Sequence, residues 1–194
     1  VGFPKFLPSY AGFSMLNEIK NINFFVNKPQ KPNLAIIGGS KISTKIDLLF
    51  NLVKKYDVIA IGGGMANTFL YAKGLDIGKS LCEKDLSEVA LSILDKAKNL
   101  NCQIILPVDL ICSDSITDQK NIRSCSVNDV IPSQMILDIG PQTTSLISEF
   151  ILVSNTILWN GPVGAFEYKP FDRSSLALAK IIKNYSKTTK ILTI

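Results

Sequence analysis

Short apolar runs alternate along the chain with longer stretches whose apolar residues recur at helical spacing. Six runs have the length and character of buried strands: 34–37, 58–61, 103–106, 135–139, 156–159 and 191–194. Between them, apolar residues recur at i, i+3, i+4 and i+7 in four segments: 42–53, 86–97, 143–153 and 174–185. Strands that alternate with helices are typical of a parallel sheet with helices on both faces. The pattern therefore predicts an α/β protein with a Rossmann-like, three-layer α/β/α arrangement.

The start of the chain follows a different pattern. Residues 9–26 are largely helical in pattern, and two prolines in residues 27–32 then interrupt it, because proline stops a helix. We expect a leading helical segment over residues 1–27 and an α/β lobe over residues 28–194.

Glycines follow four of the predicted strands. Gly38 follows the first strand, Gly63 the second, Gly140 the fourth, and the segment Asn-Gly-Pro-Val-Gly at 160–164 the fifth. Ligands of open α/β sheets bind beyond the carboxyl ends of the strands, where glycine allows close approach of the backbone. One such turn means little, but four at one edge of a parallel sheet favour a nucleotide or phosphate ligand. Neither G-x-x-x-x-G-K-[ST] nor a clean G-x-G-x-x-G is present.

The charges after the first glycine turn allow two interpretations. Ser43 is a candidate helix N-cap, and Lys41 and Lys45 are four residues apart at the predicted helix start. Two cations there oppose the helix dipole unless an anion lies between them. They are therefore either phosphate ligands or two solvated surface lysines.

Other polar residues near strand ends also have two interpretations. Asn160 and Glu167 flank an unusual loop and are candidates for phosphate and ribose contacts, or parts of a structural turn. Asp109 and Asp138 are possible metal ligands, although carboxylates at such positions more often accept hydrogen bonds from backbone N–H groups.

Composition removes several function classes. The chain has no histidine, and none of its four cysteines forms a C-x-x-C pair, which excludes Cys/His zinc sites and Ser-His-Asp triads. The net charge of +5 is scattered and does not form a nucleic-acid-binding arm, and no apolar run reaches the length of a membrane span. We expect a cytoplasmic protein with reduced thiols and neither a nucleic-acid nor a membrane partner.

Six motifs, in order, resemble the phosphoglycerate kinase family over nearly the whole chain. The most specific are Gly-Gly-Ser-Lys-Ile-Ser-Thr-Lys at 38–45, which resembles G-G-A-K-V-x-D-K, and Gly-Gly-Gly-Met-Ala-Asn-Thr-Phe at 62–69, which resembles G-G-G-M-A-x-T-F. The others are Leu-Pro-Ser-Tyr-Ala-Gly at 7–12, Leu-Pro-Val-Asp at 106–109, Leu-Asp-Ile-Gly-Pro at 137–141 and Trp-Asn-Gly-Pro-Val-Gly-Ala-Phe-Glu at 159–167.

The resemblance implies reversible phosphoryl transfer between 1,3-bisphosphoglycerate and ADP, giving 3-phosphoglycerate and ATP in glycolysis. It implies that Lys41 contacts the nucleotide phosphates and that Lys45 is the catalytic residue, which stabilises the transferring phosphoryl group. Mg²⁺ would enter with the nucleotide, and the complete enzyme would be a monomer. The remaining implied nucleotide-binding residues flank the adenine, line the site, reach the phosphates or hold the ribose: Gly38, Gly39, Gly63, Gly64, Asn160, Gly161, Pro162 and Glu167.

The chain also departs from the family pattern. Ser40 and Thr44 replace the usual Ala and Asp, and Ile136 stands where a glycine often lines the adenine pocket. We expect residues 1–27 to be the helix between two lobes, the nucleotide lobe to be incomplete at its carboxyl end, and the metal-binding Asp and the glycerate-binding lobe to lie outside the chain. Such a fragment alone would be inactive. The alternatives are a non-catalytic relic or nucleotide-binding module without turnover, and an unrelated Rossmann-like binder.

Overall fold

A five-stranded parallel sheet forms the centre of the protein. A computed structural model describes residues 2, 5–27, 29–118, 120–188 and 192–193. The strand order is β3-β2-β1-β7-β8. The strands are β1 (Asn33–Ile37), β2 (Val58–Ile61), β3 (Gln103–Ile105), β7 (Thr156–Asn160) and β8 (Leu192–Thr193). All five were predicted; Ile191 and Ile194, at the ends of the last predicted run, lie outside the described residues.

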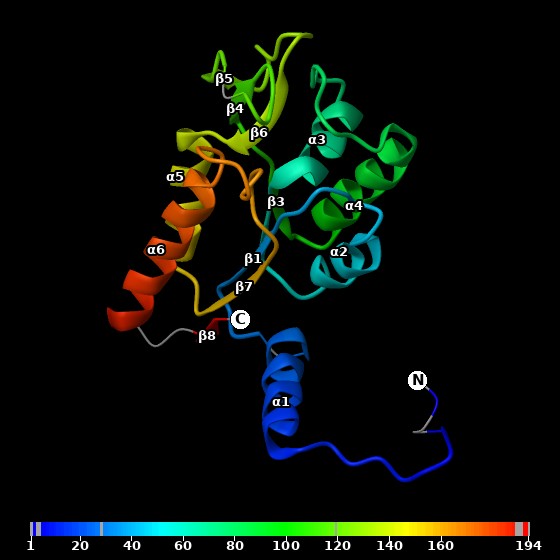
Figure 1. Cartoon of the computed structure of the whole chain (residues 1–194). Helices are drawn as coiled ribbons and strands as arrows, with labels where there is room; N and C mark the ends of the chain where they lie inside the picture. Colours follow the sequence, from blue (N-terminus) through cyan, green and yellow to red (C-terminus); the bar gives the residue numbers. More distant parts are fainter. Residues whose placement is uncertain (1, 3–4, 28, 119, 189–191, 194) are drawn as a thin grey trace.

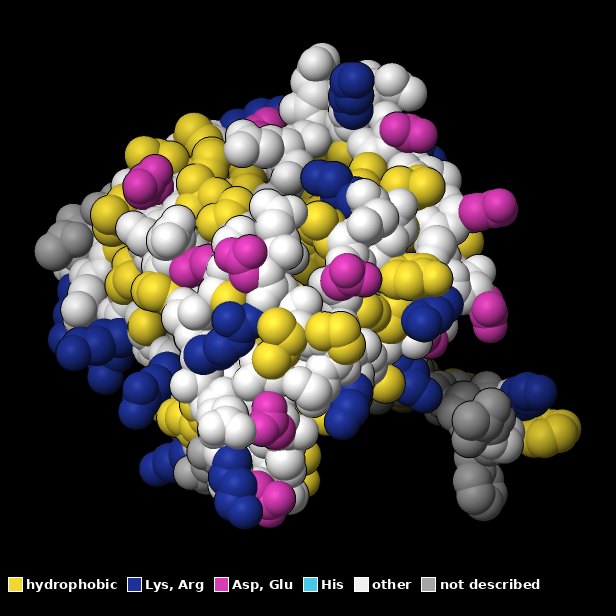
Figure 2. Space-filling model, turned by 90° about the horizontal axis from the view of Figure 1, so that it is seen from above, with side chains coloured by type: hydrophobic (Ala, Val, Ile, Leu, Met, Phe, Trp, Pro, Cys, Tyr) yellow, Lys and Arg dark blue, Asp and Glu magenta, His cyan; other side chains and the backbone are white. Residues whose placement is uncertain are grey.

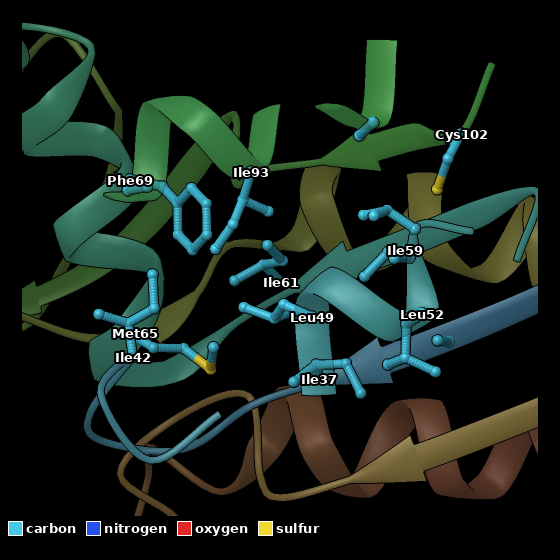
Figure 3. Close-up of a cluster of buried hydrophobic side chains, with 14 of the residues drawn as sticks. Ile37, Ile42, Leu49, Leu52, Ile59, Ile61, Met65, Phe69, Ile93 and Cys102 are labelled. Atoms are coloured by element: carbon cyan, nitrogen blue, oxygen red, sulfur yellow. The ribbon is translucent and has the colours of Figure 1, made fainter. Parts of the chain in front are cut away.

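Helices cover both faces of this sheet, as predicted (Figure 1). On one side lie α2 (Ile46–Leu52), α3 (Gly63–Ala72) and α4 (Ser87–Asn99), the last preceded by the 3₁₀ turn η2 (Lys84–Leu86); on the other lie α5 (Pro141–Ile151) and α6 (Arg173–Thr188). Successive side chains of a strand point to opposite faces. Ala35 and Ile37 therefore pack toward α2, α3 and α4, and Leu34 and Ile36 pack toward α5 and α6. Figure 3 shows the first of these cores, where Phe69 of α3 and Ile93 of α4 meet the sheet.

A second, antiparallel sheet lies beyond the first, at the top of Figure 1. It consists of β4 (Asp109–Ser113), β5 (Arg123–Ser126) and β6 (Met135–Ile139), in the order β5-β4-β6. The strand over 135–139 was correctly predicted, but its assignment to the parallel sheet was wrong, because it pairs antiparallel with β4. Gly140, which follows β6, is therefore not at the edge of the parallel sheet.

Two local predictions also fail. Ser43 is not the N-cap of α2: the helix begins at Ile46 after Lys45, and the Ser43 hydroxyl donates to Glu83 instead. Lys41 therefore precedes the helix and does not share a helical face with Lys45. Helix α3 was not predicted, because its first two residues are glycines, which disfavour helix.

The predicted leading helix is present as α1 (Phe13–Asn27). It stands apart from both sheets in Figure 1 and is preceded by an extended segment. Large apolar side chains along this part of the chain are exposed, including Tyr10 and Phe13 at about nine-tenths of their full area. In the described part of the chain, no helix combines the length and apolarity needed to cross a membrane.

Candidate functional site

Three strand ends form one continuous edge. Ile37, at the end of β1, pairs with Ile61 of β2 on one side and with Asn160 of β7 on the other. The turns that follow are hydrogen-bonded to one another. The Gly38 N–H donates to the Asn160 carbonyl at 2.9 Å, and the Gly63 N–H donates to the Val163 carbonyl at 2.8 Å. The glycine turns after β1, β2 and β7 therefore form one hydrogen-bonded unit.

Glycine is required at two of these positions for different reasons. A Cβ atom on Gly38 would collide with the carbonyl group of Pro162, so no side chain fits between the first and third turns. Gly63 has a φ angle of 67°, in the left-handed region that other residues seldom adopt. Gly63 begins α3, and the backbone of Gly39 and the carbonyl oxygen of Pro162 leave no room there for a Cβ atom.

The two lysines of the first turn differ in their surroundings. The Lys45 ammonium donates to the carbonyl oxygens of Gly38 at 2.5 Å and of Asn160 at 3.2 Å, so it lies across the ends of β1 and β7. Burial lowers the pKa of Lys45 from its usual 10.5. Lys41 is exposed on the loop before α2. Positive charge is thus held close to the three turns, with Lys41 free to reach a ligand from solvent.

A cavity of about 640 Å³ opens beside the turns, within the usual size range of small-molecule sites. One wall consists of the glycine turns and the start of α3. The opposite wall is apolar and comes from β4 and β6, with Leu110, Ile136 and Leu137 among its residues. Figure 2 views this end of the molecule and shows hydrophobic side chains exposed together, with charged side chains scattered around them.

The predicted site residues fall into three groups. Those that line the cavity directly are Gly39, Gly63, Gly64, Pro162 and Glu167. Those that join the turns to one another without lining the cavity are Gly38, Lys45, Asn160 and Gly161. Lys41 belongs to neither group and is exposed on the loop before α2.

Several residues that line the cavity could not be recognised from the sequence. Leu110 belongs to a strand that was not predicted, and Lys79 and Leu81 come from a loop without a recognisable motif. Ile136, noted as a departure from the family pattern, does line the cavity. Asn67 of α3, which also lines the cavity, is 1% exposed and donates through Nδ2 to the Leu81 carbonyl at 3.1 Å, while its Oδ1 atom has no partner among the described residues.

The two buried carboxylates accept hydrogen bonds from backbone N–H groups. Asp109 accepts from the N–H groups of Gln142 and Thr143, at 2.9 and 2.7 Å, at the start of α5. Asp138 accepts from the N–H groups of Ile139 and Ser174, at 2.9 and 3.1 Å. Over the residues that the structure describes, no cluster of three or more His, Cys, Asp or Glu side chains could hold a metal ion.

Fold and site together define an α/β protein with a cavity beside the carboxyl ends of parallel strands. The whole chain, residues 1–194, matches the family described as Phosphoglycerate kinase. The chain belongs to the phosphoglycerate kinase family.

Individual relatives agree with this assignment. "Phosphoglycerate kinase" of Xanthobacter flavus is 45% identical over 193 residues, covering 100% of this chain and 49% of the relative. That of Sinorhizobium medicae is 48% identical over 179 residues, covering 92% of this chain and 45% of the relative. The chain therefore spans about half the length of these relatives.

Solved structures give the same picture. Phosphoglycerate kinase from Coxiella burnetii superposes with a TM-score of 0.86 at 34% identity, covering 94% of this chain and 52% of that chain. The enzyme from Pyrococcus horikoshii OT3 superposes with a TM-score of 0.78 at 26% identity, covering 94% of this chain and 46% of that chain. These similarities extend the family assignment from sequence to the three-layer fold.

Proposed function

We propose that this chain supplies the ADP/ATP-binding half of a phosphoglycerate kinase, a cytoplasmic glycolytic phosphotransferase with a carboxyl group as acceptor. One observation carries the proposal: three hydrogen-bonded glycine turns at one sheet edge adjoin both a 640 Å³ apolar cavity and a loop with two lysines. An apolar cavity suits a purine base, and glycine turns with nearby cations suit a phosphate chain. Residues 1–27 would connect this lobe to the rest of the enzyme.

The proposed pose of the nucleotide follows from the contrast between the apolar cavity and the lysine-bearing loop. The base would lie between the glycine-lined wall, with Gly39, Gly63 and Gly64, and the apolar wall that contains Ile136. Glu167 is exposed at the rim of the cavity, where its carboxylate can accept hydrogen bonds from ribose hydroxyls. Pro162 lines the cavity beside it.

The phosphates would extend from the cavity toward the lysines. We assign Lys41 to the phosphate chain, because its side chain is exposed on the loop, and Lys45 to the transferring phosphoryl group. Gly38, Asn160 and Gly161 would form the backbone floor beneath the phosphates, since their turns are joined there.

The chemistry needs positioning and charge more than covalent participation. The phosphoryl group moves from the acyl phosphate of 1,3-bisphosphoglycerate to the terminal phosphate oxygen of ADP, and in reverse from ATP to the carboxylate of 3-phosphoglycerate. Phosphoryl transfer passes through a loose transition state whose charge a preorganised cation stabilises. Lys45 is held by two carbonyl groups before any ligand arrives, so its ammonium needs little rearrangement to fill that role.

Mg²⁺ would enter as part of the nucleotide substrate and neutralise phosphate charge. The glycerate would be held by the other half of the enzyme. Without that half, the reaction loses the proximity of its substrates, worth up to about 7–11 kcal/mol. We therefore propose that the chain alone binds nucleotide weakly and has no turnover. The alternative is a relic or binding module that stays inactive even when completed.

Calorimetric titration with ADP tests the binding proposal. We expect Lys41→Ala to weaken ADP binding by about tenfold, because it removes a charge-assisted contact with the phosphate chain. Lys45→Ala should weaken ADP binding less, because ADP lacks the transferring phosphoryl group. Lys98→Ala is the matched control, since Lys98 is exposed in the last turn of α4, away from the cavity. Absence of ADP binding, or equal effects of all three substitutions, would refute the assignment.

Catalysis is tested in a chimera in which residues 1–194 replace the matching half of the Xanthobacter flavus enzyme. Lys45→Ala should lower kcat by about 100- to 1,000-fold, as for the loss of a transition-state charge contact. A change within about twofold would remove Lys45 from the catalytic role. A chimera that folds and binds ADP but never turns over would favour the relic.

A further inference from the structure

A carboxylate outside the cavity holds the loop that carries both lysines. Glu83, just before η2, accepts two hydrogen bonds from Ser43: one from the hydroxyl at 2.6 Å and one from the backbone N–H at 3.0 Å. Ser43 lies midway between Lys41 and Lys45 in the sequence. Both carboxylate oxygens are engaged, so the loop is fixed in position and in orientation.

Glu83 is itself anchored to helix α3. Its backbone N–H donates to the Thr68 hydroxyl at 3.2 Å, and two residues earlier the Leu81 carbonyl accepts from Asn67. Thr68 and Asn67 are both 1% exposed. The carboxylate therefore projects from a segment held by two buried side chains, which gives the loop a stable attachment point.

The same helix also holds the start of the lysine loop. The Met65 N–H, in the first turn of α3, donates to the Gly39 carbonyl at 3.0 Å. The loop is thus attached to the α3 side at Gly39 and again at Ser43. Helix α2 adds no side-chain cap of its own, since none is present at Lys45.

The charge state of Glu83 suits this role. Burial raises its pKa, but hydrogen bonds from Ser43 and Ile42 and the nearby charge of Lys41 outweigh it and leave the pKa below the usual 4.5. The carboxylate is therefore ionised at neutral pH, so both of its oxygens can accept the hydrogen bonds from Ser43.

We propose that Glu83 is a positioning residue for the phosphate-binding loop: it holds Ser43 so that Lys41 and Lys45 face the phosphates of a bound nucleotide. This inference rests on the proposed function, because it assumes that the two lysines bind phosphate. Glu83 does not itself line the cavity, so its effect reaches the ligand only through the loop.

Positioning and simple electrostatics predict opposite results. Glu83 is an anion beside Lys41, so its removal raises the positive potential and, by charge alone, strengthens phosphate binding. If positioning dominates, Glu83→Ala weakens ADP binding instead. Adenosine lacks the phosphates, so its binding should not change in either case, whereas general damage to the fold would weaken both ligands.

The experiment titrates ADP and adenosine into the wild-type chain and into Glu83→Ala, Glu83→Gln and the control Glu88→Gln. Glu88 is exposed in the first turn of α4, and its substitution by glutamine removes one negative charge, as Glu83→Gln does. We expect Glu83→Ala to weaken ADP binding about tenfold and adenosine binding less than about twofold. Glu83→Gln, which keeps one acceptor and the side-chain length, should recover part of the loss even if the alanine variant folds poorly.

Hydrogen exchange supplies a readout without ligand. The Ser43 amide should exchange at least about tenfold faster in Glu83→Ala, because its acceptor is gone, and at the wild-type rate in Glu88→Gln. Unchanged Ser43 exchange, tighter ADP binding, or equal losses for ADP and adenosine would each overturn the inference while leaving the proposed function intact. A wild-type chain that binds no ADP would overturn the proposed function, and this inference with it.

Discussion

Asp138 offers a test of how burial and hydrogen bonding balance in the wall of the cavity. It lies near the end of β6 and is 3% exposed. Burial raises its pKa to about 6, the hydrogen bonds from Ser174 and Ile139 oppose the rise, and the nearby charge of Asp172 adds to it. We predict that substitution by asparagine, which does not titrate, changes how stability depends on pH.

The sign and magnitude follow from linkage. The folded pKa of about 6 exceeds the usual value of 3.8, so the folded state binds the proton more tightly than the unfolded state. The stabilising contribution is fully present below pH 3.8 and is lost as the pH rises through about 6. A shift of about two units corresponds to about 3 kcal/mol, at about 1.4 kcal/mol per unit.

Urea unfolding of the wild-type chain and of Asp138→Asn, between about pH 4 and about pH 7, measures this contribution. The asparagine keeps the acceptor for the Ile139 N–H but loses the one for the Ser174 N–H, a cost that does not depend on pH. The free energy of unfolding of the wild type minus that of the variant should fall by about 2–3 kcal/mol across this range. A difference that stays flat or rises with pH would show that the N–H groups outweigh burial.

Three further predictions concern other parts of the lobe. Gly38→Ala should reduce ADP affinity by more than about tenfold, because the new methyl group collides with the Pro162 carbonyl, and calorimetry would detect the change. Phe69→Ala should lower the free energy of unfolding by about 3–5 kcal/mol in urea titrations, since the ring is completely buried; a loss under about 1 kcal/mol would contradict the packing. Burial raises the pKa of Cys102 to about 11 and that of Cys112 to about 12, so neither should react with a disulfide reagent at neutral pH until the chain is unfolded, as mass spectrometry can check.

The parallel sheet could be predicted because each of its strands is recognisable from its own local sequence. Residues Asn33–Ile37 of β1 are buried on both faces, and such strands appear as continuous apolar runs. The antiparallel sheet gives no such signal. Strand β5 has the sequence Arg-Ser-Cys-Ser and is only half-buried, so its pairing with β4 depends on contacts distant in sequence.

The candidate site, like the fold, could be predicted where local sequence determines it and not where it depends on tertiary packing. The glycine turns and the two lysines follow predicted strands directly in the sequence. The order of strands and turns along the chain was therefore enough to place three of the four turns at one edge of the parallel sheet. Gly140 failed because the strand before it, although correctly recognised, leaves the parallel sheet. Apart from Ile136, the apolar side of the cavity could not be predicted, because Leu110 and Leu81 reach the cavity only through tertiary packing.

The central claim is that a nucleotide occupies the cavity beside the three glycine turns. Titration of ¹⁵N-labelled chain with ADP, followed by two-dimensional NMR, tests it directly. We predict that the largest shifts occur at the amides of Gly39, Gly63, Gly64 and Ile136, which line the cavity, while the shallow hollow over residues 123–132 stays unchanged. Shifts concentrated in that hollow, or spread evenly over the surface lysines, would contradict the account.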